Sequence, residues 1–278
     1  MTIREALRLA AARLEQAGVP DADVDAAYLL ASVLKEDTLA MRINGHRELA
    51  APQRAAFDAL CDRRAAREPL QYILGETEFM GLTFHVEPGV LIPRADTEIL
   101  VEKALAWMKP GARVLDIGTG SGAIAVSLAK LGRQAQVTAV DVSDRALEIA
   151  RRNAERNGAV VEFVKSDCFS ALKGRKYDMI VSNPPYISED EMRELMPEVT
   201  REPELALFGG ADGLDFYRRI SREAPEYLNE GSCLLFEIGW LQKDAVSALV
   251  KAHIGEPFAL RDYGQNWRVV GAKKEGAC

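Results

Sequence analysis

The stretch VLDIGTGSGAIAVSLA, residues 114–129, decides the fold of this chain. It has the pattern of a buried strand, a turn with three glycines and the beginning of a helix. Gly118, Gly120 and Gly122 allow the backbone to approach a ligand closely, and the helix N-terminus presents unpaired N–H groups. Asp141 ends the next apolar run about 20 residues later, where an acidic side chain can accept hydrogen bonds from ribose hydroxyls.

The glycine turn alone leaves the identity of its ligand open. Gly118, Gly120 and Ala123 also satisfy the dinucleotide pattern G-x-G-x-x-G/A, so a nicotinamide cofactor and S-adenosylmethionine fit it equally well. A turn that binds nothing is a third interpretation, and the well-placed acid downstream argues against it.

Apolar strands and helical stretches alternate from this turn to the end of the chain. Such alternation predicts an α/β fold with a parallel sheet. Only three residues separate the last two strands, too few for a crossover, so these two should pair antiparallel. The expected strands cover residues 113–118, 136–142, 161–167, 177–183, 232–239, 258–263 and 267–274.

The chain before the glycine turn predicts two further parts. Residues 1–73 have helical periodicity, and Thr2 and Glu5 form a possible T-x-x-E capping box at the first helix. Residues 74–95 place aromatic and β-branched residues between glycines, which predicts a β-hairpin linker. Residues 96–278 then form the domain that carries the glycine turn.

Composition limits the possible functions. The net charge is −7, and residues 1–70 hold ten Lys and Arg against eleven Asp and Glu, so no nucleic-acid contact is expected. The four cysteines lie far apart and the three histidines lack ligand spacing, which predicts no metal site and fits a reducing cytoplasm. No stretch reaches the roughly 18 apolar residues of a membrane span, and the charged beginning is not a signal peptide.

The sequence NPPY, residues 183–186, follows the apolar run at residues 177–182. Because parallel strands end at one edge of a sheet, the glycine turn, Asp141, Asp167 and Asn183 should line one crevice. Asp167 can equally be a helix cap or a turn residue. Hydride transfer does not require this stiff polar corner, whereas methyl transfer to a planar nitrogen requires polar groups that orient the nitrogen.

The corner offers a way to activate an amide nitrogen, a poor nucleophile because its lone pair is delocalised. The side-chain oxygen of Asn183 and the backbone carbonyl of Pro184 can accept its two N–H groups, and Pro185 helps to fix their direction. Tyr186 offers an aromatic face and a favourable field for a sulfonium. Such positioning can supply roughly 7–11 kcal/mol of a barrier. We expect no general base, and therefore a rate nearly independent of pH from about 6.5 to 9.

Together these features resemble class I S-adenosylmethionine-dependent methyltransferases that act on amide or amino nitrogens. Residues 67–98, NPPY and residues 202–220 further resemble the protein-(glutamine-N5) methyltransferases of peptide chain release factors. The resemblance runs from the N-terminal helices to the C-terminal strands. Residues 67–98 are its most specific part, since NPPY also occurs in DNA-adenine enzymes.

The resemblance implies an enzyme of translation termination with a Rossmann-like methyltransferase domain, a helical substrate-recognition domain and a hairpin linker. It would methylate the glutamine N5 of the release factor Gly-Gly-Gln motif and leave S-adenosyl-L-homocysteine. Asn183, Pro184 and Tyr186 would be catalytic, and residues 183–186, with Pro185, would bind the substrate. The implied S-adenosylmethionine residues are Gly118, Thr119, Gly120, Ser121, Gly122, Asp141, Asp167, Cys168 and Asn183.

Two positions depart from the family pattern. Ala95 stands where proline is usual, and Cys168 replaces a bulkier aromatic residue, for which Phe169 can compensate beside an adenine. Residues 91–96 are expected to border the crevice.

Three other activities stay open: methylation of a ribosomal-protein glutamine, methylation of a nucleic-acid adenine, and cofactor sensing without catalysis. An adenine enzyme usually needs a basic nucleic-acid-reading region, which this chain lacks. A cytoplasmic monomer with release factors as partners is expected.

Overall fold

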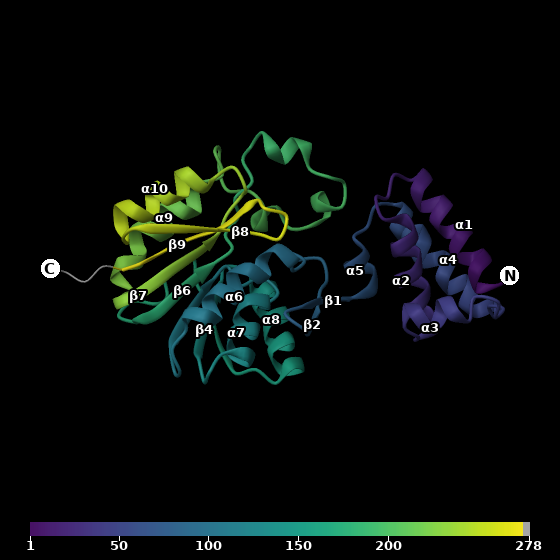
Figure 1. Cartoon of the computed structure of the whole chain (residues 1–278), viewed down its shortest axis with the longest axis horizontal. Helices are drawn as coiled ribbons and strands as arrows, with labels where there is room; N and C mark the ends of the chain where they lie inside the picture. Colours follow the sequence, from purple (N-terminus) through teal and green to yellow (C-terminus); the bar gives the residue numbers. More distant parts are fainter. Residues whose placement is uncertain (275–278) are drawn as a thin grey trace. The chain divides into compact units, whose positions relative to one another are not determined.

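The computed structural model describes residues 1–274, which divide into two compact units (Figure 1). The first unit comprises Met1–Glu76 and Met196–Arg201, and the second comprises Thr77–Leu195 and the chain from Glu202 onward. Residues 196–201 therefore group with the helical unit, although the sequence analysis assigned them to the domain of residues 96–278.

The first unit consists of helices packed around an apolar core that includes Phe57. The expected capping box is present, because Thr2 Oγ1 accepts from the Glu5 backbone N–H at 3.3 Å and Glu5 accepts from the Thr2 N–H at 2.8 Å. Helices α3 and α5 were not predicted, since segments this short show no clear helical period. The helices are α1 (Ile3–Gln16), α2 (Ala22–Leu34), α3 (Thr38–Ile43), α4 (Ala51–Ala65), α5 (Leu70–Leu74) and η3 (Val199–Arg201).

Ion pairs fix the segment Met196–Arg201 within the first unit. Both carboxylate oxygens of Glu198 accept hydrogen bonds from Arg67 at 2.6 Å, and Arg64 Nη1 lies 2.9 Å from the same carboxylate. Buried Arg64 also donates to Asp25 at 2.6 Å. Burial raises the pKa of Glu198, but the bonds from Arg67 and Arg64 outweigh it and hold that pKa at about 2.

The predicted hairpin is formed by β1 (Glu76–Phe79) and β2 (Leu82–His85). Its turn residues Met80 and Gly81 have φ values of 52° and 70°. Positive φ at both positions is the geometry of a two-residue type I′ turn, which matches the twist of the paired strands.

The described part of the second unit contains a seven-stranded sheet in the order β5-β4-β3-β6-β7-β9-β8. The predicted α/β class and the antiparallel pairing of the last two strands are confirmed. Strand β9 also runs antiparallel to β7, while β3 to β7 pair in parallel. The strands are β3 (Arg113–Ile117), β4 (Gln136–Asp141), β5 (Val161–Lys165), β6 (Tyr177–Ser182), β7 (Leu228–Glu237), β8 (Pro257–Arg261) and β9 (Trp267–Lys273).

Two apolar cores lie on opposite faces of this sheet. Neighbouring strand residues alternate between them, as Val114 and Leu115 do, because successive side chains of a strand point to opposite faces. Helices α6 (Glu98–Trp107), α7 (Ala123–Leu131) and α8 (Asp144–Asn157) cover one face, and α9 (Asp215–Glu223) and α10 (Lys243–His253) cover the other (Figure 1). Short turns of 3₁₀ helix are η1 (Ala95–Thr97), η2 (Glu191–Glu194), η4 (Glu204–Ala206) and η5 (Ala224–Glu226).

Candidate active site

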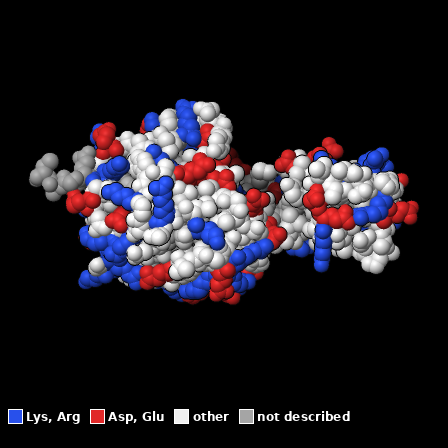
Figure 2. All heavy atoms as spheres, turned by 60° about the horizontal axis from the view of Figure 1, so that its bottom comes forward, with Lys and Arg blue, Asp and Glu red and all other residues white. Residues whose placement is uncertain are grey.

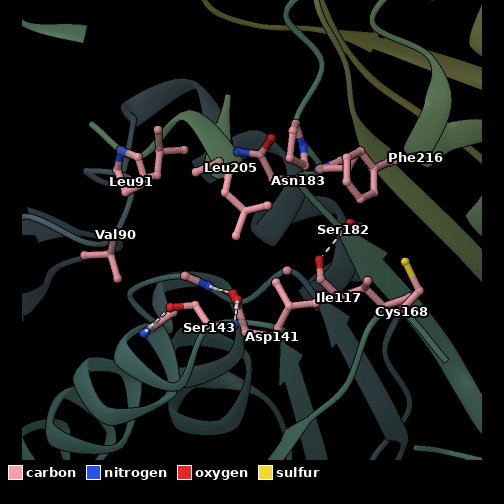
Figure 3. Close-up of a pocket in the computed structure, with 18 of the residues that line it drawn as sticks. Val90, Leu91, Ile117, Asp141, Ser143, Cys168, Ser182, Asn183, Leu205 and Phe216 are labelled. Atoms are coloured by element: carbon pink, nitrogen blue, oxygen red, sulfur yellow. Dashed lines mark hydrogen bonds between the residues drawn. The ribbon is translucent and has the colours of Figure 1, made fainter. Parts of the chain in front are cut away.

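A cavity of about 150 Å³ lies at the carboxyl ends of β3, β4 and β6 (Figure 3). Strand β3 leads into the glycine turn, β4 ends at Asp141, and β6 ends at Ser182, directly before Asn183. The predicted site residues that line the cavity are Gly118, Gly120, Asp141, Asp167, Cys168, Asn183, Pro184 and Pro185.

The three glycines of the turn have different tasks. Their φ values of 76°, 55° and 83° lie in the left-handed region, which other residues adopt at a cost. A Cβ added to Gly118 or Gly120 would meet no atom within 4 Å, so these two positions leave the backbone open to a ligand. A Cβ on Gly122 would lie 3.0 Å from the Cβ of Ala150, so Gly122 allows the turn to pack against α8.

Asp141 connects the glycine turn to the start of α8. Its Oδ2 accepts from the Gly120 N–H and its Oδ1 from the Ser143 N–H, both at 2.9 Å. Burial raises the pKa of Asp141, and the bonds from Ser143 and Gly120 oppose this rise. A carboxylate has about four acceptor directions. The directions that backbone groups do not occupy remain for hydroxyl groups of a ligand in the cavity.

Thr119 and Ser121 belong to the turn but do not line the cavity. Thr119 Oγ1 donates to Asp116 Oδ2 at 2.7 Å beneath the turn. Burial raises the pKa of Asp116 to about 7, although the bond from Thr119 opposes this. The Ser121 side chain is buried, and its backbone carbonyl accepts from Asn153 Nδ2 at 2.8 Å. Both residues thus support the turn from within the protein.

Asn153 also joins α8 to the hairpin. It accepts from the His85 N–H at 2.7 Å and donates to the His85 carbonyl at 3.0 Å. Residues 89–91, which follow the hairpin, form one wall of the cavity. Of residues 91–96, which were expected to border the crevice, Leu91 lines the cavity and the other five do not.

Asp167 lines the cavity, but its carboxylate is engaged elsewhere. Oδ1 accepts from Arg219 Nη1 at 2.6 Å, and the backbone carbonyl accepts from Nη2 at 3.1 Å. The side chain is more than half exposed, so solvent screens its charge. This environment gives Asp167 less weight than Asp141 as a ligand-binding acid.

The wall beside Asp167 is apolar. Burial raises the pKa of the Cys168 thiol to about 11, so this residue offers an uncharged surface. Phe169 does not line the cavity but stacks on Tyr227, with 4.4 Å between ring centroids. Phe216 of α9 supplies an aromatic ring here instead (Figure 3).

The NPPY corner closes the other side of the cavity. Asn183 Nδ2 donates to Thr97 Oγ1 of η1 at 3.3 Å. Tyr186 lies outside the cavity and lines a neighbouring groove with Trp240. Burial, and next the nearby charge of Glu237, raise the pKa of Tyr186 well above its usual range. The phenol is therefore neutral at physiological pH.

The segment that begins at Glu202 lies at the cavity, a position that the sequence did not predict. Its buried carboxylate accepts from the Ile92 N–H at 2.9 Å and pairs with Arg94. Pro203 and Leu205 then line the cavity, with Leu205 pointing into it (Figure 3). The spacing between this segment and the glycine turn gave no signal for their proximity.

Glu237, the last residue of β7, was also missed and is 1% exposed. Ser182 pairs with Phe236, so the next residues, Asn183 and Glu237, leave neighbouring strands side by side. Burial raises the pKa of Glu237 to about 7, against a hydrogen bond with Thr97 and the charge of Arg268. Glu237 reaches Asn183 only through Thr97, so the expected pH-independent rate stays a prediction that a pH profile tests. A glutamate at the end of the apolar run CLLFE was the available signal.

Comparisons with known proteins agree with this arrangement. The family described as PrmC N-terminal domain matches residues 5–75, and the Methyltransferase small domain matches residues 82–206. A crystal structure of a methyltransferase from Pyrococcus furiosus shares the fold, with a TM-score of 0.54 at 24% identity over 70% of this chain and 90% of that one.

Two curated relatives carry the name release factor glutamine methyltransferase. The protein from Geobacter sulfurreducens is 46% identical over 274 residues, which cover 98% of this chain and 96% of the relative. The protein from Cereibacter sphaeroides is 43% identical over 281 residues, which cover 100% of both chains. Identity at this level along the whole chain shows that it belongs to the release factor glutamine methyltransferase family.

Proposed function

We propose that this chain transfers a methyl group from S-adenosylmethionine to the glutamine side-chain nitrogen N5 in the Gly-Gly-Gln motif of a peptide chain release factor. The observation that carries the proposal is the meeting of the glycine turn, Asp141 and the Asn183–Pro184 corner at one cavity. The names of the relatives support the substrate class.

The cavity suits S-adenosylmethionine in its chemistry. The open left-handed positions at Gly118 and Gly120 let the backbone approach the ligand. Asp141 keeps acceptor directions for the ribose hydroxyls, and Cys168 and Phe216 offer apolar contact to an adenine. When bound, S-adenosylmethionine supplies an electrophilic methyl group, and the electrons of the broken C–S bond stay on sulfur.

The protein contributes orientation at the reacting nitrogen. Asn183 Oδ1 and the Pro184 carbonyl accept the two N–H groups of the substrate amide and direct its lone pair toward the methyl carbon. The nitrogen forms the N–C bond and releases one proton to water. Both acceptors are uncharged, so neither serves as the base. Tyr186 stays a predicted catalytic residue, and its place in the neighbouring groove favours contact with the polypeptide flanking the glutamine.

The surface charge of the helical unit fits a protein substrate. Lys and Arg alternate with Asp and Glu on the face of the helical unit seen in Figure 2, so that face offers no basic path for a nucleic acid. Within residues 1–274, no helix combines the length and the apolar character that crossing a bilayer requires. We place the enzyme in the cytoplasm and treat the monomer as a prediction. Cys61, Cys168 and Cys233 are free and buried, and Cys278 lies outside the described residues.

The test uses the purified chain, isotopically labelled S-adenosylmethionine and an intact release factor. Peptide mass spectrometry should find one methyl group on the Gly-Gly-Gln glutamine, and none when that glutamine is replaced by asparagine. Parallel reactions with a ribosomal protein and with an adenine-containing oligonucleotide test the two related activities. Label on either of these, with none on the release factor, would refute the proposal.

A further inference from the structure

We propose that Thr97 and Glu237 are positioning residues that hold the Asn183 side chain in the one orientation that presents its oxygen to the substrate amide. The inference rests on the proposed function, because it concerns the acceptor that Asn183 provides. It assigns a task to a fully buried carboxylate that the transfer chemistry itself does not use.

The three side chains lie in series, with Thr97 between Asn183 and Glu237. Asn183 Nδ2 donates to Thr97 Oγ1 at 3.3 Å. Hydrogen bonding with Thr97 opposes the rise in the pKa of Glu237, which places these two side chains next to each other. Thr97 is 4% exposed and lies outside the cavity, so it reaches a substrate only through Asn183. The Glu237 backbone is itself held, since its carbonyl accepts from Tyr217 Oη at 2.9 Å.

The side-chain amide of asparagine has two nearly isosteric orientations, and only one is useful here. With Nδ2 committed to Thr97, Oδ1 can accept an N–H of the substrate. In the flipped orientation, Nδ2 would meet the substrate N–H groups, and two donors would oppose each other. Thr97 alone cannot choose, because its hydroxyl both donates and accepts.

Glu237 decides between the two orientations. An ionised carboxylate only accepts, so it takes the Thr97 hydroxyl hydrogen and leaves Thr97 Oγ1 as the acceptor for Asn183 Nδ2. A protonated Glu237 can donate to Thr97 instead. The Thr97 hydrogen is then free to turn to Asn183 Oδ1, which permits the flipped amide.

The groups around Glu237 set its protonation, and with it the preferred orientation of the Asn183 amide, to change near neutral pH. Burial raises its pKa to about 7, so the carboxylate forms as the pH rises through neutrality. No described residue donates to its Oε2, in keeping with the cost of ionising it. The neighbouring charged and titratable groups are Arg268 of β9, Arg94, Asp96, Tyr186 and Tyr217 of α9. Burial lowers the pKa of Arg268, but its bond to Asp262 and the nearby acidic groups outweigh this and raise it. Burial raises the pKa of both tyrosines well above neutrality.

The first experiment is a double-mutant cycle with single-turnover rates on intact release factor at pH 8. Thr97→Val should lower the rate about tenfold in the wild-type background, the scale of one lost orienting hydrogen bond. In the Asn183→Ala background, the same change should alter the rate less than about twofold, because the side chain that Thr97 orients is gone. Thr97→Ser keeps the hydroxyl and should stay within about threefold of wild type.

Binding and pH separate this role from a merely structural one. Thr97→Val should keep S-adenosylmethionine affinity within about threefold by calorimetry, which also shows that it folds. Glu237→Gln should be several-fold slower than wild type at pH 8.5, because its amide can donate to Thr97 as well as accept. The two rates should converge near pH 6, where Glu237 is protonated.

Three results would overturn the inference. The first is an equal loss of rate from Thr97→Val in the wild-type and Asn183→Ala backgrounds. The second is a wild-type rate for Thr97→Val. The third is a ratio of wild-type to Glu237→Gln rates that stays constant from pH 6 to 8.5. Absence of release factor methylation by the wild-type chain would instead refute the proposed function, so the two failures can be distinguished.

Discussion

Replacing Asp141 with asparagine should weaken S-adenosylmethionine binding much more than the same change at Asp167. In the wild type, each oxygen of Asp141 accepts one backbone N–H at 2.9 Å, from Gly120 and from Ser143. Asparagine has one acceptor oxygen, and its NH₂ group must face one of these two donors. The variant therefore loses one backbone bond, the negative charge and at least one acceptor direction toward the ribose.

The size of the effect follows from these losses. A hydrogen bond to a charged group contributes about 1.5–3 kcal/mol, so losing one from a ribose hydroxyl should raise the Kd for S-adenosylmethionine roughly 10- to 100-fold. The backbone N–H left without a partner should lower the free energy of unfolding by about 1–3 kcal/mol. Calorimetry measures the first effect and urea denaturation without cofactor the second.

Asp167→Asn is the matched control. That side chain is more than half exposed and paired with Arg219, so removing its charge should change the Kd less than about fivefold. Equal effects of the two substitutions, or an Asp141→Asn variant that binds within threefold of wild type, would show that Asp141 does not hold the ribose.

Asn183→Ala should leave S-adenosylmethionine affinity nearly intact and lower the single-turnover rate about 10²–10³-fold; a loss below fivefold would remove its assigned role. Gly122→Ala should lower the free energy of unfolding by about 2–4 kcal/mol, through left-handed strain and the 3.0 Å approach to Ala150. Gly120→Ala should lower the free energy of unfolding by only about 1–2 kcal/mol, but should weaken S-adenosylmethionine binding more than Gly122→Ala does. Urea denaturation and calorimetry compare the two variants. The paired Glu198 carboxylate stabilises the wild type above about pH 4.5, and this stability is lost as the pH falls toward the Glu198 pKa of about 2. Glu198→Gln should lack it, so plots of the free energy of unfolding against pH for the two proteins should converge in acid. Tyr28, Leu39 and Ile43 of the helical unit are 50%, 68% and 70% exposed. If this unit selects the substrate, replacing all three with serine should lower kcat/KM on intact release factor but not on a Gly-Gly-Gln peptide. Unchanged preference for the intact factor would argue against that role.

The last of these experiments replaces a simple truncation. Deleting residues 1–73 would remove Arg64 and Arg67 and leave Glu198 without its partners. The segment Met196–Arg201 leads directly into Glu202 and the cavity wall at Leu205. A lower rate of the truncated enzyme could therefore come either from lost substrate docking or from a disturbed wall of the active site.

Local pattern was sufficient for much of the fold and part of the site. The strands from Arg113 onward, the capping box at Thr2 and the glycine turn depend on residues close in sequence, so periodicity and turn chemistry predict them. The shared cavity of Gly118, Asp141 and Asn183 also follows, because the carboxyl ends of parallel strands meet at one edge of a sheet.

Only the tertiary structure decided which side chains support that cavity. Thr97 meets Asn183 across 86 positions of sequence, Ile92 meets Glu202 across 110, and Arg67 meets Glu198 across 131. Glu237 lies beside Asn183 because β7 pairs with β6 in a particular register. A sequence pattern reports which face of an element is buried, but strand order and register are set by the packing of the whole sheet. The partners of a buried polar group therefore become known only when the elements are assembled.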